Sequence, residues 1–143
     1  APPPCPVPPL ASFDSITTEY GSVDPTHPEP SKPHGGRDYK IPSGTPIYSA
    51  DSGTVIWSRN TGKAGLEVVV RSGNTNTYYM HMQSFSITER MHVEAGQRLG
   101  YSDNTGHSTG PHLHLEQHSP ASNWPFDPNG VPPRNTRIAP CTI

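Results

Sequence analysis

The prolines of this 143-residue chain are concentrated at its ends, and this placement limits what the chain can fold into. Ten of the 19 prolines lie in residues 1–33, two in residues 34–110 and seven in residues 111–143. Proline has a fixed φ and no backbone donor, so helix interiors and central strands exclude it. We therefore predict a Pro-rich N-terminal arm over residues 1–33 and a folded domain over residues 34–143.

The composition excludes several classes of protein. A net charge of −2 and a pI near 6.5 give no basic surface for nucleic acid or for an anionic bilayer. No window approaches 18 consecutive apolar residues, so we expect no membrane insertion. Proline and glycine together make up 32 of the 143 residues, which argues against a helix-rich fold. The length suits a single domain with one core.

The middle of the chain alternates strand-like runs with turn signals. Ser72-Gly73-Asn74 reads as a hairpin turn, and a helix is expected only as about one turn around Ser84–Glu89. We predict a mainly β, antiparallel, compact single domain with little helix. Its expected extended segments are residues 45–50, 53–58, 66–71, 75–82, 97–101 and 111–118.

The two cysteines, Cys5 and Cys141, lie at opposite ends of the chain. They are too few for a four-cysteine zinc site and too far apart for a CxxC redox motif. A disulfide between them is the natural use. It would tie the C-terminal tail back to the arm and imply an oxidising compartment. The alternative is two unrelated buried thiols.

Three histidine-containing segments are candidates for chemistry. In a strand, His112 and His114 face the same side about 6–7 Å apart, so spacing alone leaves either able to reach a metal ion. His34 and Asp38 flank two glycines that would let the backbone bend toward a ligand. His81 lies between two methionines. Each segment alone has a simpler interpretation, as exposed strand histidines, a chance pair in a loop, or a hydrogen-bonded core histidine.

Taken together, the segments suit a catalytic zinc site. Such a site uses three protein ligands, and two histidines with one carboxylate form a suitable set. Five candidate groups are more than one ion needs. The surplus fits side chains that move protons or stabilise an oxyanion beside the metal.

In order along the chain, these segments resemble the lysostaphin-type (LytM-domain) zinc endopeptidases, which cut peptidoglycan peptides. The resemblance covers about 85 residues. It runs through His34-Gly-Gly-Arg-Asp38-Tyr, Pro42-Ser-Gly-Thr-Pro46, Ala50-Asp-Ser-Gly-Thr-Val55, Tyr79-Met-His81-Met, Val93-Glu-Ala-Gly-Gln-Arg-Leu-Gly100 and Asn104-Thr-Gly-His-Ser-Thr-Gly-Pro-His112-Leu-His114-Leu-Glu116.

The resemblance implies a role for each candidate residue. His34, Asp38 and His114 would bind one zinc ion per chain, and His81 and His112 would be catalytic histidines beside it. It also implies antiparallel β-structure with the zinc at the floor of a narrow, loop-walled groove. The implied activity is hydrolysis of peptide bonds in peptidoglycan stem peptides or cross-bridges by a zinc-activated water. Which bond is cut stays open.

Two other functions remain as alternatives: a non-catalytic module that binds the wall or activates a hydrolase, and a structural zinc domain. The complete set of five residues argues against both. We expect a monomer that is secreted or resides in the periplasm or cell envelope. The other histidines, His27, His92, His107 and His118, are not expected to bind metal. Four aromatic residues could line a peptide groove, although packing is the more common use: Trp57, Tyr78, Tyr79 and Trp124.

Overall fold

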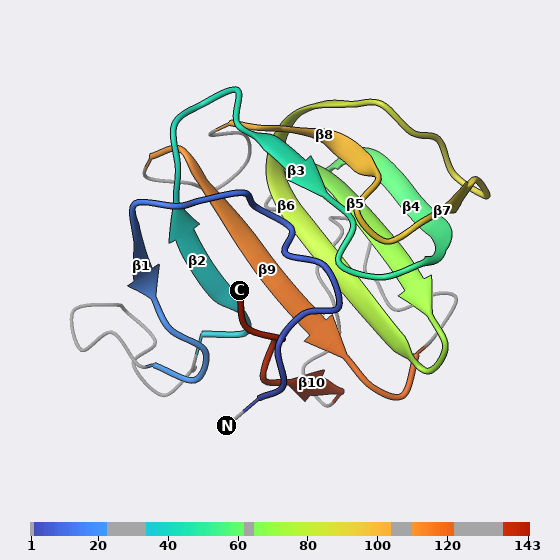
Figure 1. Cartoon of the computed structure of the whole chain (residues 1–143), viewed down its shortest axis with the longest axis horizontal. Coiled ribbons are helices and arrows are strands. Elements are labelled where there is room, and N and C mark those ends of the chain that lie inside the picture. Colours follow the sequence, from blue (N-terminus) through green and yellow to red (C-terminus); the bar gives the residue numbers. More distant parts are fainter. Residues whose placement is uncertain (1, 23–33, 62–64, 104–109, 122–135) are drawn as a thin grey trace.

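Strands make up nearly all the regular structure of the computed structural model, which describes residues 2–22, 34–61, 65–103, 110–121 and 136–143 (Figure 1). All pairings between named strands in these ranges are antiparallel, which confirms the predicted mainly β fold. The strands are β1 (Ser15–Thr18), β2 (Arg37–Lys40), β3 (Pro46–Tyr48), β4 (Gly53–Thr61), β5 (Gly65–Ser72), β6 (Thr75–Phe85), β7 (His92–Val93), β8 (Arg98–Ser102), β9 (His112–His118) and β10 (Arg137–Ile138).

The main sheet has the strand order β1-β2-β9-β6-β5-β4-β7. Strand β10 pairs with β9, and β8 joins β3 to the far half of β6. In Figure 1, β3, β8 and the N-terminal segment lie in front of the long central strands. One face of the main sheet is therefore covered by this second layer.

Six predicted segments match six strands, β3, β4, β5, β6, β8 and β9, within a few residues. The predicted helical turn around Ser84–Glu89 is wrong. Ser84 and Phe85 extend β6 and pair with Tyr101 and Gly100 of β8. The Ser86 amide then donates to the carbonyl of Leu99. Because these backbone groups pair across strands, they are not available to close a helical turn.

The main core lies between the two layers. Alternate residues of β5 and β9 point into it, including Val68, Val70, Leu113 and Leu115. Leu10 from the Pro-rich segment is fully buried in the same cluster. Residues before position 23 thus contribute to the core, and β1 adds an edge strand to β2. The boundary predicted near residue 33 stays a prediction.

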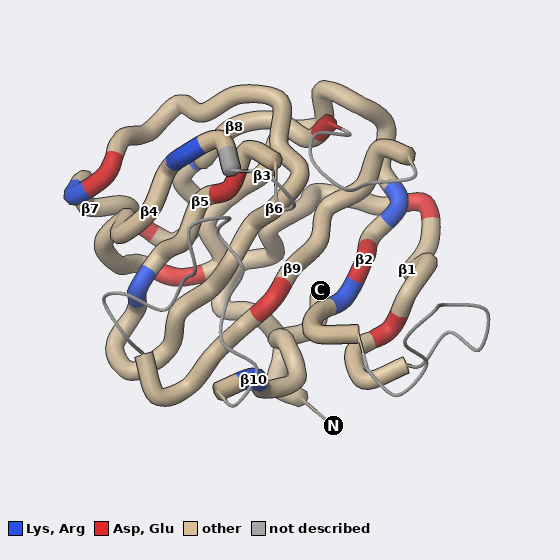
Figure 2. The backbone as a smooth tube through the Cα atoms, turned by 180° about the vertical axis from the view of Figure 1, so that it is seen from behind, with Lys and Arg blue, Asp and Glu red and all other residues tan. Residues whose placement is uncertain are grey.

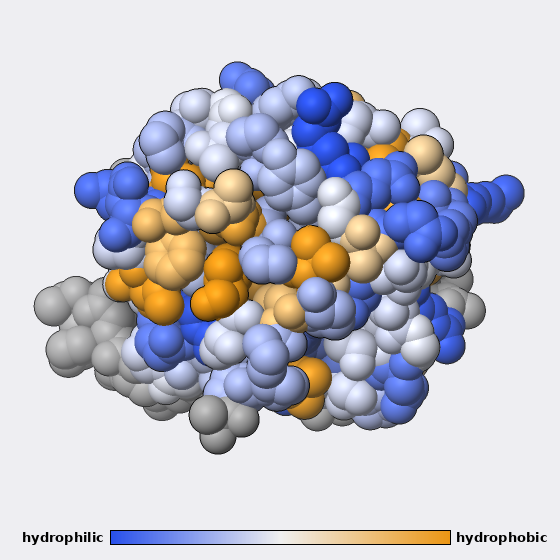
Figure 3. All heavy atoms as spheres, in the orientation of Figure 1, coloured by the Kyte–Doolittle hydropathy of each residue, from blue (hydrophilic) through white to orange (hydrophobic). Residues whose placement is uncertain are grey.

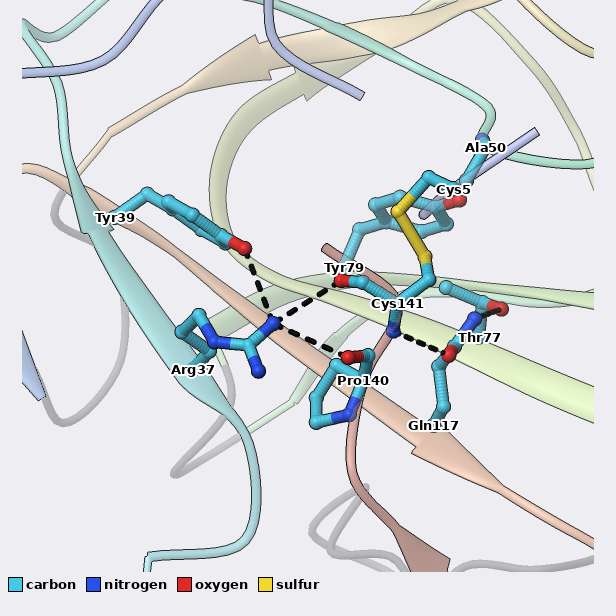
Figure 4. Close-up of a disulfide and its surroundings, with 9 residues drawn as sticks. All are labelled: Cys5, Arg37, Tyr39, Ala50, Thr77, Tyr79, Gln117, Pro140 and Cys141. Atoms are coloured by element: carbon cyan, nitrogen blue, oxygen red, sulfur yellow. Dashed lines mark hydrogen bonds between the residues drawn. A yellow bond between two sulfur atoms is a disulfide. The ribbon is translucent and has the colours of Figure 1, made fainter. Parts of the chain in front are cut away.

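A disulfide between Cys5 and Cys141 joins the two ends of the chain (Figure 4). Around it, Arg37 donates hydrogen bonds to the carbonyls of Pro140 and Cys141 at 3.2 and 3.1 Å. On the other side, the Cys141 amide donates to the side chain of Gln117 at 2.8 Å. The C-terminal tail is therefore held against β2 and β9, the strands that also carry Asp38 and His114.

We expect removal of this disulfide to destabilise the fold, because the bridge closes a loop with a sequence separation of 136 residues. In the chain-entropy model, a loop of this length constrains the unfolded state by up to about 5 kcal/mol. The measurement is urea unfolding of the Cys5→Ser/Cys141→Ser variant against the oxidised protein. Equal unfolding free energies would contradict the prediction, and a Ser52→Ala variant provides an exposed control.

An apolar area lies on the surface beside the chain ends. In Figure 3, hydrophobic atoms gather near β1, and the half-exposed Ile16 and Ile143 contribute there to a hollow that Phe13 also lines. Among the described residues there is no helix with the length and apolar character needed to cross a membrane.

Candidate metal centre

The pairing of β2 with β9 places Asp38 directly opposite His114. On the other side of β9, Met80 of β6 is opposite the same histidine. Because Leu113 and Leu115 point into the core, His112 and His114 point to the other face of the sheet. Figure 2 views the sheet from behind, and the acidic positions on β2 and β9 are red there. Sheet register therefore brings together residues that are 76 positions apart.

Three side chains converge on this face. Nδ1 of His114 lies 2.8 Å from Oδ1 of Asp38, and Nε2 of His34 lies 3.2 Å from Oδ2 of the same carboxylate. One potential ligand atom from each residue lies within 4.8 Å of the others. The three side chains are 12–21% exposed, so the cluster is shielded but reachable.

His34 reaches the cluster from the turn before β2, where the backbone passes close to β9. At Gly36, a Cβ atom would lie 2.3 Å from the carbonyl oxygen of Leu115 and 2.8 Å from Nε2 of His114. Only glycine allows this approach. Gly36 is therefore needed for packing against β9, whereas a Cβ atom at Gly35 would lie 2.6 Å from the side chain of Arg137.

The electrostatics of the cluster keep its carboxylates ionised. Burial would raise the pKa of Asp38, but hydrogen bonds from His114 and His34 hold it below its usual range. Burial would lower the pKa of His114, but its hydrogen bonds to Asp38 and Glu116 raise it to about 10. Without a metal ion, His114 is therefore a cation at neutral pH. A metal ion that binds at Nδ1 must displace a proton from it.

His112 lies beside the three converging residues with a defined orientation. Its Nδ1 lies 2.7 Å from the carbonyl oxygen of Gly110. A carbonyl only accepts, so Nδ1 carries the proton and Nε2 is the basic nitrogen. This Nε2 lies 3.7 Å from Oδ1 of Asp38. The base of His112 is thus turned toward the cluster.

His81 reaches the same place through a β-bulge. Leu66 pairs with Met82 and Val68 with Tyr79, so Met80 and His81 together oppose the single residue Glu67. His81 has a φ of 63°, which is uncommon for a residue other than glycine. Regular alternation would point His81 into the core beside Tyr79. The bulge instead places its ring 4.9 Å from the ring of His112.

The donor set fits zinc. Two imidazole nitrogens and one carboxylate oxygen are ligands that Zn²⁺ prefers, and three protein ligands are the usual number at a catalytic zinc site. His34, Asp38 and His114 would hold the ion. The structure thus brings together the three predicted ligands and places both predicted catalytic histidines next to them.

Two partners of the cluster were not predicted as part of the site. Glu116 accepts from Nε2 of His114, and His118 contacts the other oxygen of Glu116. Their signal is in the sequence, because positions 112, 114, 116 and 118 share one face of a strand. His92 is exposed and pairs with Glu94 far from this cluster in the sheet order.

The aromatic candidates serve packing where the structure describes them. Trp57, Tyr78 and Tyr79 are all buried, at 5% exposure or less. His27, His107 and Trp124 lie outside the described residues. The walls of the expected groove stay a prediction.

The family of the chain follows from its match to a known family model. A model of peptidase family M23 matches residues 32–128, more than half of the chain. The chain belongs to peptidase family M23. This assignment confirms the resemblance to lysostaphin-type peptidases, and the matched range includes all five predicted site residues.

Curated relatives of this M23 domain match it over part of their length. Peptidoglycan DD-endopeptidase ShyA of Vibrio cholerae is 44% identical over 85 residues, which are 59% of this chain and 20% of that protein. DD-carboxypeptidase/endopeptidase Mpg of Neisseria meningitidis is 39% identical over 84 residues, or 58% of this chain and 19% of that protein. The M23 chain thus spans about a fifth of the length of these relatives.

Solved structures share the fold of the M23 domain. The catalytic domain of prophage-encoded EnpA from Enterococcus faecalis superposes with a TM-score of 0.72 at 28% identity, over 94% of this chain and 95% of that one. The lysostaphin catalytic domain from Staphylococcus simulans gives 0.69 at 26% identity, over 76% and 84%. A zinc-containing peptidase from Vibrio cholerae gives 0.72 at 29% identity, over 92% and 40%.

Proposed function

We propose that this M23 chain is a zinc-dependent endopeptidase that hydrolyses peptide bonds in peptidoglycan stem peptides or cross-bridges. The observation that carries the proposal is the convergence of His34, Asp38 and His114 with His81 and His112 beside them. The names of the curated relatives support the substrate class. The disulfide and those relatives support a location outside the cytoplasm, in the envelope or secreted.

When bound, zinc would supply Lewis-acid activation of water and of the scissile carbonyl at neutral pH. His112 would accept the proton of the attacking water at Nε2, because its Nδ1 proton is committed to Gly110. The same nitrogen could then return the proton to the departing amine. His81, on the bulge, would donate to the carbonyl oxygen as negative charge develops on it.

A non-catalytic wall-binding module would need the three ligands at most. Wall binding alone would not require the bulge that turns His81 toward His112, nor the orientation of the basic nitrogen of His112 toward the cluster. A structural zinc site is closed by four protein ligands, whereas the residues that the structure describes bring three to this cluster. Both observations favour catalysis.

The test is mass spectrometry of peptides released from cell walls of several cross-link chemistries. The zinc-loaded protein should release shorter or uncross-linked peptides, and walls with D-amino-acid cross-links are the first choice because several relatives are named DD-endopeptidases. Metal-stripped protein is the control. A zinc-loaded protein that binds walls and releases nothing from any of them would favour the binding module.

A further inference from the structure

We propose that Glu116 is a positioning residue for the metal centre, which holds the imidazole of His114 in the tautomer and orientation that zinc requires. The inference rests on the proposed zinc site and extends it to a residue that does not itself touch the metal or the substrate.

His114 must present a lone pair at the nitrogen that faces the other ligands. That nitrogen is Nδ1, 2.8 Å from Oδ1 of Asp38. A neutral imidazole with a lone pair at Nδ1 carries its proton on Nε2, and a buried N–H needs an acceptor. His114 is only 12% exposed in its side chain, so water is a poor substitute.

Glu116 supplies this acceptor. Its Oε1 lies 2.9 Å from Nε2 of His114, on the opposite edge of the ring from Asp38. The His114 ring lies between Glu116 and the other ligands. Glu116 therefore orients a ligand and is not itself a fourth ligand. A carboxylate that accepts from the second nitrogen of a ligating histidine orients the ring and makes the ligand more basic.

Glu116 is itself held from its other oxygen. Oε2 lies 2.5 Å from Nε2 of His118, and Nδ1 of His118 lies 2.7 Å from the hydroxyl of Thr136. Nε of Arg137 is 3.9 Å from the same carboxylate oxygen. Glu116 and His118 are 3% and 1% exposed. The carboxylate therefore has one available position, set by β9 and by the segment that begins β10.

The neighbouring residue provides a matched control. Gln117 is also buried on β9 and also hydrogen-bonded, to Thr77 and to the amide of Cys141, but on the opposite face of the strand. Its truncation removes a buried polar side chain of the same length without touching His114. Loss of general stability and loss of metal positioning can thus be separated.

The experiment measures zinc affinity by competition with a chromophoric chelator, together with urea unfolding of the metal-free proteins. We expect Glu116→Ala to weaken zinc binding by about 10–100-fold, the usual range for loss of such a partner. Gln117→Ala should lower stability and leave zinc affinity unchanged. Glu116→Gln keeps an acceptor for His114 and should lose less than about tenfold.

Nuclear magnetic resonance of ¹⁵N-labelled histidine rings gives a second readout that does not depend on activity. In the zinc-loaded wild type, His114 should show a protonated, hydrogen-bonded Nε2, and Glu116→Gln should shift that resonance. If Glu116→Ala fails to fold, this shift and the affinity of Glu116→Gln decide the question. Wild-type zinc affinity and an unshifted resonance in Glu116→Gln would overturn the inference, as would equal losses of affinity in Glu116→Ala and Gln117→Ala.

The outcome is distinguishable from failure of the proposed function. A wild-type protein that binds zinc and cleaves walls while Glu116→Ala binds zinc equally well refutes the role of Glu116 alone. A wild-type protein that binds zinc in a Glu116-dependent manner but cleaves nothing refutes the peptidase and retains the positioning role. A wild-type protein that binds no zinc refutes both.

Discussion

His114→Ala should lose both zinc and activity, whereas His112→Ala should keep nearly stoichiometric zinc and lose activity by about 10²–10⁴-fold. His114 contributes the nitrogen nearest to Asp38, at 2.8 Å. Its loss leaves two ligands, His34 and Asp38, which cannot hold the ion well. The basic Nε2 of His112 faces the cluster, 3.7 Å from Oδ1 of Asp38. The His112→Ala substitution therefore removes a proton acceptor and leaves the three ligands in place.

The measurement is metal content beside hydrolysis rate for each purified variant. His81→Ala should behave as His112→Ala does, because its ring lies next to that of His112. His92→Ala is the control, since this histidine is exposed and paired with Glu94. If purified His112→Ala contains no metal while His114→Ala retains it, the roles of ligand and proton acceptor are reversed between these two histidines.

Much of this site was predictable because strand geometry is periodic. Alternation alone places His112 and His114 on one face, and the same rule would have added Glu116 and His118. The pairing of Asp38 with His114 was not predictable from spacing, since it depends on which strand lies beside β9. The family resemblance supplied that contact. Alternation specifies which face of β9 a residue occupies, but it does not specify which strand pairs with β9.

His81 shows more clearly what strand alternation cannot predict. Its neighbours Tyr79 and Met82 are core residues three positions apart, a spacing that regular alternation does not allow. The bulge that reconciles them requires a positive φ at a histidine, where sequence reasoning would look for glycine. Without the resemblance, the interpretation of His81 as a core histidine would have stood.

The fold was predictable in its long strands and less so in its short ones. The valine-rich run of β5 and its hairpin with β6 have clear local signals. β1 and β2 have four residues each, and neither lies among the extended segments predicted from the sequence. β2 is held against the C-terminal tail, because Arg37 donates to the carbonyls of Pro140 and Cys141. Such contacts between distant segments leave no local pattern.

Gly36→Ala should weaken zinc binding and reduce activity by about 100-fold or more, although the residue carries no side chain to lose. The added Cβ would lie 2.3 Å from the carbonyl oxygen of Leu115, which belongs to the β9 backbone and cannot move like a flexible side chain. The turn must therefore shift, and it carries His34 on one side and Asp38 on the other. A displacement of about 1 Å in a catalytic constellation can cost about 100-fold in rate.

Gly53→Ala is the matched control, because its Cβ would lie 2.1 Å from the carbonyl oxygen of Arg71 at the β4–β5 pairing. Both substitutions overpack backbone against backbone and should destabilise the fold by about 1–3 kcal/mol. Only Gly36→Ala should change the zinc affinity of the folded protein, measured by chelator competition under conditions where both variants are native. Equal affinities in the two variants would mean that the turn absorbs the added methyl group without moving its ligands, and that β9 does not set their position.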